Sequence, residues 1–383
     1  MKTTFKTSRP VFLWSCLPVL AAAAFSHATA QAETFVYVSN AADGTISSFQ
    51  LDAAAGTLRP VETVTAGPAV MPLAQSPTGR YLYAAIRSKP YSVMTYRIDA
   101  SSGKLDPVST AALPESMAYI STDRTGRFLF AASYGGDLVS VNPISPLGVV
   151  QGETLQIVKT GRFAHSIVAD PTNRFVYVGN LGAQQMLQFH FDERTGELKK
   201  LGTGSVDAPA GSGPRHSVFS PNGRFLYNVA ELDGTVTRYA TDRGTGQLTR
   251  EESVESAPAR FKLEKGLTVA PTTPDTVPRI WAADIKITPN GRFLYTSERT
   301  SSTITAFGVD AVTGKLSRIN DIEVAKQPRG FAIDPTGRWL VTSGEKSREV
   351  GLYRIDPASG ELKKQATVDA GAGANWVEIV ETR

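Results

Sequence analysis

One short pattern, a tight turn followed by an apolar run, occurs six times along the 383-residue chain. The third turn residues, at 79, 126, 173, 223, 291 and 337, are spaced by 47, 47, 50, 68 and 46 positions. A second turn follows most copies, so each period contains four short β-rich runs, which is typical of a β-propeller blade. The copies are SPTGRYLYAA (76–85), DRTGRFLFAA (123–132), DPTNRFVYVG (170–179), SPNGRFLYNV (220–229), TPNGRFLYTS (288–297) and DPTGRWLVTS (334–343).

The two ends of the chain supply a further blade. Residues 34–64 read as the last three strands of a blade, and residues 373–381 read as a lone first strand. Joined, they close the ring and remove the exposed sheet edges of an open array. The sequence therefore predicts an all-β fold, a seven-bladed β-propeller with four antiparallel strands per blade. Two separate all-β domains are the alternative, but no Pro/Ser-rich linker interrupts the period.

The first 32 residues have the features of an export signal. Three basic residues precede an apolar run over 11–25, and small-x-small cleavage patterns follow it. The run is too short for a comfortable membrane span. We therefore expect a cleaved signal peptide over 1–32, a single propeller domain over 33–383 and a periplasmic location. A lipoprotein signal at Cys16 is the alternative, although the apolar run continues past that cysteine.

Removal of this segment changes what charge and cysteine content indicate. It contains three of the 40 basic residues, which leaves 37 basic against 36 acidic residues. So balanced a chain gives no reason to expect a nucleic-acid partner. The only cysteine is also removed, which excludes disulfides, thiolate metal sites, a Cys nucleophile and covalent haem. We expect a monomer without a membrane span.

The repeats also locate a candidate site. In each blade the innermost strand begins, and the second strand ends, on one face of the ring, because the strands are antiparallel. The residues at these two positions vary between copies, whereas the scaffold residues are nearly constant. A merely solvated rim is the alternative, but two of the three histidines that remain, His165 and His216, begin adjacent inner strands. The varying positions collect Arg87, Tyr134, His165, Arg215, Glu231, Arg299, Arg329 and Glu345 at one mouth.

One period is longer than the others. The spacing of 68 reflects extra residues near 256–279, a stretch rich in Pro and Thr. Its place between an outer strand and the next inner strand predicts a long loop on one face. We interpret it as a tolerated insertion, with a cap over a pocket as the alternative.

Several segments resemble the seven-bladed propeller lactonase family, which includes bacterial 6-phosphogluconolactonase and fungal carboxymuconate-cyclising enzymes. They are GPRH (213–216) with NVAEL (228–232), WAADIKITPNGRFLY (281–295), QPRGFAIDPTGRWL (327–340) and NWV (375–377). The resemblance covers essentially the whole mature chain, and it implies a site at His165, Arg215, Glu231 and Arg299. The export signal is a departure, because the bacterial phosphogluconolactonases of this family are cytoplasmic. A phosphorylated substrate is therefore in doubt.

The implied activity is hydrolysis of a sugar-acid lactone, which needs an activated water, a stabilised oxyanion and an acid for the leaving alkoxide. Glu231 or His165 is the expected general base, and Arg299 completes the catalytic set. The residues expected to bind an anionic lactone are Arg215, His216, Arg87 and Arg329. So much Arg argues against a metal, and no cofactor is expected. Lactonising or isomerising chemistry on a carboxymuconate-type dicarboxylate, and a non-catalytic binding platform, remain alternatives.

Overall fold

The structure is a computed structural model, and it describes all residues except 9, 12–31, 270–275 and 383. Its contacts divide the chain into residues 1–31 and residues 32–383. The expected signal peptide, with Cys16, therefore lies largely outside the described residues. Among the residues that the structure describes, none belongs to a helix with the length and apolar character of a membrane span.

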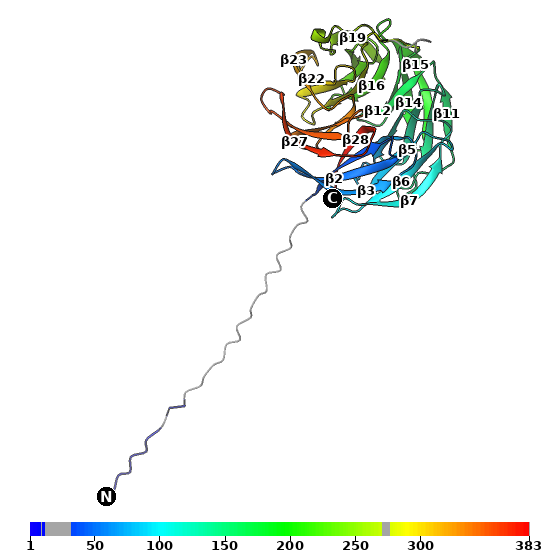
Figure 1. Cartoon of the computed structure of the whole chain (residues 1–383). Coiled ribbons are helices and arrows are strands. Elements are labelled where there is room, and N and C mark those ends of the chain that lie inside the picture. Colours follow the sequence, from blue (N-terminus) through cyan, green and yellow to red (C-terminus); the bar gives the residue numbers. More distant parts are fainter. Residues whose placement is uncertain (9, 12–31, 270–275, 383) are drawn as a thin grey trace. The chain divides into compact units, whose positions relative to one another are not determined.

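Within residues 32–383, the described strands form seven four-stranded antiparallel sheets, each of which is one blade (Figure 1). This arrangement confirms the predicted seven-bladed propeller. From the innermost strand outward, the first four blades are β28 (Ala374–Glu381), β1 (Thr34–Asn40), β2 (Thr45–Asp52), β3 (Thr57–Thr65); β4 (Val70–Gln75), β5 (Tyr81–Ile86), β6 (Ser92–Ile98), β7 (Leu105–Ala112); β8 (Tyr119–Thr122), β9 (Phe128–Ser133), β10 (Leu138–Pro143), β11 (Gln156–Lys159); and β12 (Ala164–Ala169), β13 (Phe175–Asn180), β14 (Gln185–Asp192), β15 (Glu197–Asp207). The other three are β16 (Pro214–Phe219), β17 (Phe225–Ala230), β18 (Thr235–Thr241), β19 (Leu248–Glu255); β20 (Ala282–Ile287), β21 (Phe293–Glu298), β22 (Thr303–Val309), β23 (Leu316–Glu323); and β24 (Pro328–Ile333), β25 (Trp339–Gly344), β26 (Glu349–Ile355), β27 (Leu362–Asp369).

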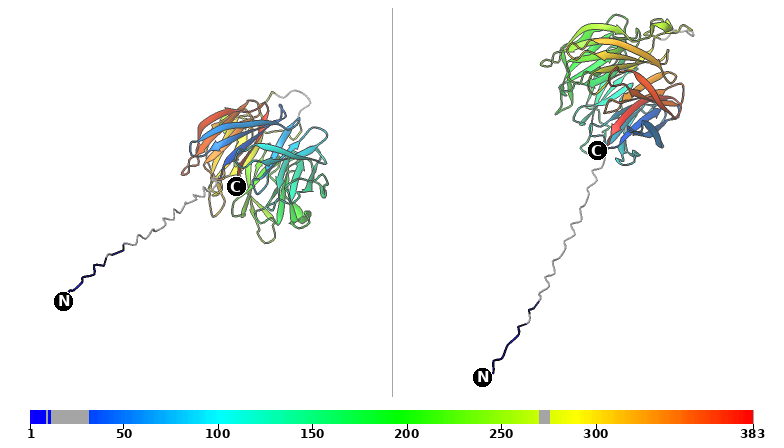
Figure 2. Two further views of the ribbon diagram at one scale, coloured as in Figure 1. Left: turned by 90° about the horizontal axis from the view of Figure 1, so that it is seen from below. Right: turned by 90° about the vertical axis from the view of Figure 1, so that its left-hand side faces the viewer.

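The ring is closed by strands from the two ends of the domain. Each inner strand contacts the inner strand of the next blade, and β28 contacts both β24 and β4. β28 pairs with β1, so that Val380 lies opposite Phe35 and Val377 opposite Val38. Figure 2 shows the red C-terminal strand beside the blue N-terminal strands. The predicted closure is confirmed.

The repeated turn joins each inner strand to the second strand. Its third residue adopts a left-handed conformation, with φ of 68° at Gly223 and 60° at Asn173. Glycine adopts this conformation without steric cost, and Asn is among the few other residues that tolerate it. The Ser220 hydroxyl accepts the backbone N–H of Phe225 at 3.0 Å and fixes the start of β17.

Neighbouring blades cover both faces of the middle strands. All six residues of β17 are buried, and Phe225 and Tyr227 pack with Leu294 and Phe307 of the next blade. The second turn of that blade completes the contact, since the Tyr227 hydroxyl donates to the Gly314 carbonyl at 2.8 Å. A Cβ atom on Gly314 would lie 2.5 Å from the Phe225 ring, so only glycine fits there. The mouth of the ring is thus held by rigid, interlocked blades.

The insertion lies between β19 and β20, as the sequence predicts. It contains the 3-10 helix η1 (Ala259–Phe261), and Arg260 forms an ion pair with Asp321 of the next blade. The Gly266 N–H donates to the Leu232 carbonyl at 2.7 Å, and the Ile280 N–H donates to the Glu264 carbonyl at 2.8 Å. Both described ends of the insertion are therefore bound beside the end of β17.

Candidate active site

Irregularities in the inner strands bring consecutive side chains to the mouth. Between β16 and β17, Pro214 lies opposite Ala230 and Ser217 opposite Asn228, with a register shift between them. Arg215 and His216 fall within this shift. A β-bulge leaves residues out of the regular alternation and re-aims their side chains, and bulges are frequent beside active sites. Similar shifts occur at the mouth ends of β12 and β20.

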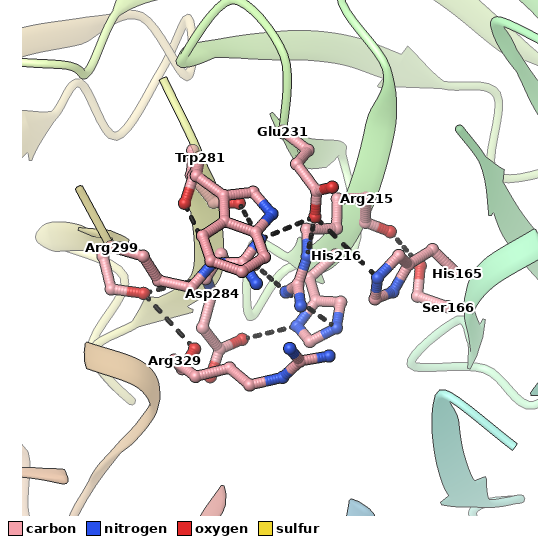
Figure 3. Close-up of polar contacts among 12 residues, drawn as sticks. His165, Ser166, Arg215, His216, Glu231, Trp281, Asp284, Arg299 and Arg329 are labelled. Carbon is pink, nitrogen blue, oxygen red and sulfur yellow. Dashed lines mark hydrogen bonds and ion pairs between the residues drawn. The ribbon is translucent and has the colours of Figure 1, made fainter. Parts of the chain in front are cut away.

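Glu231 is the centre of a buried cluster. It follows β17, and its Oε2 accepts hydrogen bonds from Arg215 Nε at 2.7 Å and Arg299 Nη2 at 2.8 Å (Figure 3). His165 Nε2 lies 3.9 Å from the same oxygen. Arg215 is 0% exposed, Arg299 2%, His165 4% and Glu231 8%. Such burial is unlike a solvated rim, and it makes these electrostatic interactions strong.

Both candidate bases are in their proton-accepting forms at neutral pH. Burial alone would raise the pKa of Glu231, but Arg299, Arg215 and Arg329 outweigh it and hold the pKa below its ordinary value. Burial, with Arg215 next in importance, holds the pKa of His165 well below its usual range. Glu231 is therefore a carboxylate and His165 a neutral imidazole.

A second row of polar side chains supports this cluster from behind. Arg215 Nη1 lies 3.1 Å from His216 Nε2 and also donates to the Ala283 carbonyl. His216 Nδ1 lies 2.9 Å from Asp284 Oδ1, and Asp284 Oδ2 lies 3.3 Å from Lys286 Nζ. Burial and then Arg215 lower the pKa of His216 to about 3, so this imidazole is also neutral.

A cavity of about 560 Å3 opens above the cluster. One part of its wall is cationic, with Arg87, Arg299 and Arg329, and another is apolar, with Leu267 and Trp281. The Arg299 guanidinium lies 3.7 Å from the centre of the Trp281 ring, a cation–π contact that braces it from one side. The described lining residues are Arg87, Ala118, Tyr134, His165, Glu231, Leu232, Gly266, Leu267, Thr268, Val277, Pro278, Arg279, Ile280, Trp281, Arg299, Thr300 and Arg329.

Arg87 and Arg329 form the cationic end of the cavity. Burial first, and then the nearby charge of Arg329, lower the pKa of Arg87 to about 10, so the Arg87 guanidinium remains charged at neutral pH. Arg87 Nε donates to Ser116 Oγ at 3.1 Å, and Arg329 Nε is buried without a hydrogen-bond partner in the part of the chain that the structure describes. Two cations held close together in this way favour an anionic ligand group between them.

The structure brings most of the predicted site residues into the cavity wall and places two behind it. His165, Glu231, Arg299, Arg87 and Arg329 line the cavity. Arg215 and His216, which the sequence analysis assigns to substrate binding, are buried and do not line it. The register shift at the start of β16 directs both side chains into the protein. There Arg215 is hydrogen-bonded to Glu231, and His216 is hydrogen-bonded to Asp284.

Glu345 also stays outside the cavity lining, although it stands where Glu231 stands in its own blade. Its carboxylate accepts a hydrogen bond from Gln327 Nε2 at 2.9 Å. Tyr134, which occupies the equivalent position after β9, lines the cavity and stacks on Phe163, with ring centres 4.3 Å apart.

Sequence reasoning missed three features of the site. Asp284 stands five residues before Pro289, as His216 stands five residues before Pro221, so the repeat register contains a signal for it. Trp281 stands eight residues before Pro289, and the same position before Pro171 is occupied by another aromatic residue, Phe163. The insertion contributes Leu267 and other lining residues from its described parts, which favours the cap interpretation over a merely tolerated loop.

The arrangement is suited to acid–base chemistry on an ester. An ionised carboxylate, a neutral imidazole and charged guanidinium groups converge on one cavity, which is the set needed to activate water and stabilise an oxyanion. In the described part of the chain, no group of three or more His, Cys, Asp or Glu side chains is arranged to hold a metal ion.

Comparisons with known proteins find relatives that align with most of the chain. A family model described as lactonase, seven-bladed β-propeller, matches residues 31–379. A 6-phosphogluconolactonase of Pectobacterium carotovorum is 39% identical over 299 residues, which are 78% of this chain and 84% of the relative. One from Serratia proteamaculans is 40% identical over 300 residues, again 78% and 84% of the two chains.

Solved structures extend the similarity to the fold. The periplasmic gluconolactonase of Pseudomonas aeruginosa has a TM-score of 0.78 at 24% identity, and the alignment covers 91% of this chain and 99% of that one. A protein from Lactobacillus plantarum has a TM-score of 0.79 at 24% identity, with 92% and 100% covered.

Proposed function

The chain belongs to the seven-bladed β-propeller lactonase family, and from this premise we propose that it hydrolyses a sugar-acid lactone by water activated between His165 and Glu231. The observation that carries this proposal is the neutral imidazole 3.9 Å from a carboxylate that two buried guanidinium groups keep ionised. The relatives that support it are named 6-phosphogluconolactonases.

His165 is the better proton acceptor of the two. A proton on Glu231 would cancel the charge that Arg215 and Arg299 both bind, whereas a proton on His165 would create an ion pair with Glu231. The weak basicity of His165 also helps the second half of the reaction, because its protonated form readily gives the proton to the leaving alkoxide.

Arg299 is proposed to stabilise the oxyanion that forms as water attacks the lactone carbonyl. Its Nη2 is bonded to Glu231 and its plane is braced by Trp281, so the group is held in place before the substrate arrives. Loss of a single preorganised oxyanion donor lowers turnover by about 10²–10³-fold in other hydrolases.

The proposed substrate carries an anionic substituent. Of the charged side chains that line the described cavity, four are Arg (87, 279, 299 and 329) and one is Glu. Arg87 and Arg329 offer donors to a carboxylate or a phosphate away from the reacting carbonyl. Because phosphorylated sugars are scarce outside the cytoplasm, an exported enzyme favours a carboxylate or an unphosphorylated lactone.

We also propose that the protein is exported to the periplasm as a monomer after loss of residues 1–32. Support comes from the basic, apolar and small-residue pattern of that segment. The similar structure from P. aeruginosa is named a periplasmic gluconolactonase.

The test is a comparison of three lactones with the purified mature protein. Glucono-δ-lactone, its 6-phosphate and a glucaric acid lactone are followed by pH-stat within seconds of mixing, because such lactones also open spontaneously. The proposal expects turnover of at least one and lower KM values for the two anionic lactones. Rates equal to the uncatalysed rates for all three would contradict it.

A further inference from the structure

We infer that Asp284 is a positioning residue, which fixes the tautomer of His216 and through it the place of Arg215 against Glu231. Asp284 is 3% exposed and is absent from the cavity lining that the structure describes. The expected effect of Asp284 on turnover rests on the proposed function. The tautomer of His216 can be measured without any substrate.

The tautomer of His216 is determined from both sides. Asp284 Oδ1 lies 2.9 Å from His216 Nδ1, and a carboxylate can only accept, so Nδ1 carries the hydrogen. On the other side, Arg215 Nη1 lies 3.1 Å from His216 Nε2, and a guanidinium can only donate. Nε2 therefore presents a lone pair to Arg215. Both contacts require the tautomer with hydrogen on Nδ1. Neither contact could form if the hydrogen were on Nε2.

The ring of His216 has little freedom to leave this position. It packs edge-on against Tyr119, with ring centres 4.9 Å apart, and lies 5.5 Å from Trp376. On the far side of Asp284, Lys286 Nζ lies 3.3 Å from Oδ2. Burial alone would raise the pKa of Asp284, but Lys286 and His216 outweigh it and hold the pKa below its usual range.

The contact with His216 matters because, among the described residues, no other side chain bonds to Nη1 of Arg215, and Nη2 has no hydrogen-bond partner there. Nη1 is held by His216 and the Ala283 carbonyl, and this directs Nε at Glu231 Oε2, 2.7 Å away. In the opposite tautomer, the Nε2–H of His216 would face an N–H of Arg215. The guanidinium would then move, and Glu231 would lose one of the two cations that keep it ionised.

Asp284→Asn tests this directly. Each Asp284 oxygen already faces an N–H donor of the backbone, Ile285 at 2.9 Å on Oδ1 and Phe331 at 3.4 Å on Oδ2. An amide must therefore place its NH2 group against a donor in either orientation. We expect kcat to fall by about 10–100-fold, by analogy with the loss seen when the outer hydrogen-bond partner of a metal-binding imidazole is removed. KM should change by less than about twofold, because the side chain at position 284 does not contact the substrate.

Two substitutions of His216 separate positioning from packing. His216→Gln keeps an acceptor for Arg215 and a donor for Asp284 and should retain most of the activity. His216→Phe keeps the ring against Tyr119 and Trp376 but has neither group, and should lose about as much kcat as Asp284→Asn. Equal kcat values for His216→Gln and His216→Phe would overturn the inference. This comparison decides the matter even if the Asp284→Asn protein does not fold.

The matched control is Asp334→Asn, the same change at a buried carboxylate that only closes a turn, where other repeats have Ser76, Ser220 or Thr288. Asp334 Oδ1 accepts the N–H groups of Arg338 and Trp339 at 2.8 and 2.7 Å. We expect lower thermal stability with unchanged kcat. A fall in kcat as large as that of Asp284→Asn would show that loss of any buried carboxylate has this effect, and would overturn the inference.

Imidazole 15N NMR provides the readout that needs no activity. The wild-type spectrum should show His216 with hydrogen on Nδ1, assigned by loss of its signals in His216→Gln, and Asp284→Asn should shift it toward the other tautomer. Hydrogen on Nε2 in the wild type would overturn the inference. If the wild-type protein opens no lactone, the proposed function fails, whereas the tautomer measurement still decides the role of Asp284.

Discussion

Replacement of Glu231 by Gln removes the negative charge that two buried guanidinium groups share. Arg215 and Arg299 are 0% and 2% exposed, and both donate to Glu231 Oε2. Gln preserves the shape of the side chain and one acceptor oxygen, but it leaves both cations without the carboxylate to which they are hydrogen-bonded. Loss of one partner from a buried ion pair costs about 3–5 kcal/mol of folding free energy.

This cost converts into a measurable shift of the melting temperature. An unfolding entropy of about 2.1 cal/mol/K per residue over roughly 350 residues gives about 1.4 °C per kcal/mol, so Tm should fall by about 4–7 °C. Lactone turnover should fall by about 10²-fold or more, because the charge that would stabilise protonated His165 is gone. Scanning calorimetry at a fixed scan rate and initial rates in a pH-stat measure the two effects.

Glu345→Gln is the matched control for this prediction. Glu345 follows β25 as Glu231 follows β17, but it is partly exposed, and it accepts its hydrogen bond from the neutral Gln327 rather than from a buried guanidinium group. Its loss should move Tm by no more than about 1 °C and leave turnover unchanged. A Glu231→Gln protein with the wild-type Tm would refute the claim that Glu231 neutralises the two buried arginines.

Four further outcomes are expected. The acid limb of the pH dependence of kcat/KM should lie below pH 6.5, the ordinary pKa of His, because neutral His165 is the active form and its pKa is lowered. An acid limb above pH 6.5 would contradict this. Arg329→Gln should raise KM for an anionic lactone about tenfold while KM for a neutral lactone stays within about twofold, and equal effects on both would exclude an anion-binding role. Truncation after Ala372 removes β28 and should abolish cooperative thermal unfolding, so an unchanged circular dichroism melt would contradict ring closure. N-terminal sequencing of periplasmic protein should begin near residue 33, and full-length protein in the cytoplasm would oppose export.

The fold was predictable because each blade depends on a local requirement that the sequence must show. The third turn residue needs a left-handed conformation, so Gly or Asn recurs there at the spacing of one blade. The middle strands are covered on both faces, so they read as unbroken apolar runs. The lone strand at 374–381 was recognisable because only one strand was missing from the N-terminal blade.

The site was predictable only where it follows the repeat register. Glu231 and Arg299 occupy the same position in adjacent blades, and comparison of the copies is enough to find them. The depth of Arg215 and His216 was not predictable, because simple alternation sends neighbouring residues to opposite faces, and the bulge removes that alternation. The contribution of Leu267 depends on the path of an insertion that no other repeat shares.

The central claim is that the cavity beside Glu231 hydrolyses a lactone with His165 as the proton acceptor. The most direct test is single-turnover ring opening of the preferred lactone by the mature wild-type protein and by His165→Gln, which keeps polarity but cannot take up a proton at neutral pH. We expect His165→Gln to bind the lactone with nearly the wild-type Kd and to open it about 10²–10⁴-fold more slowly. Ring opening by His165→Gln at the wild-type rate would contradict it.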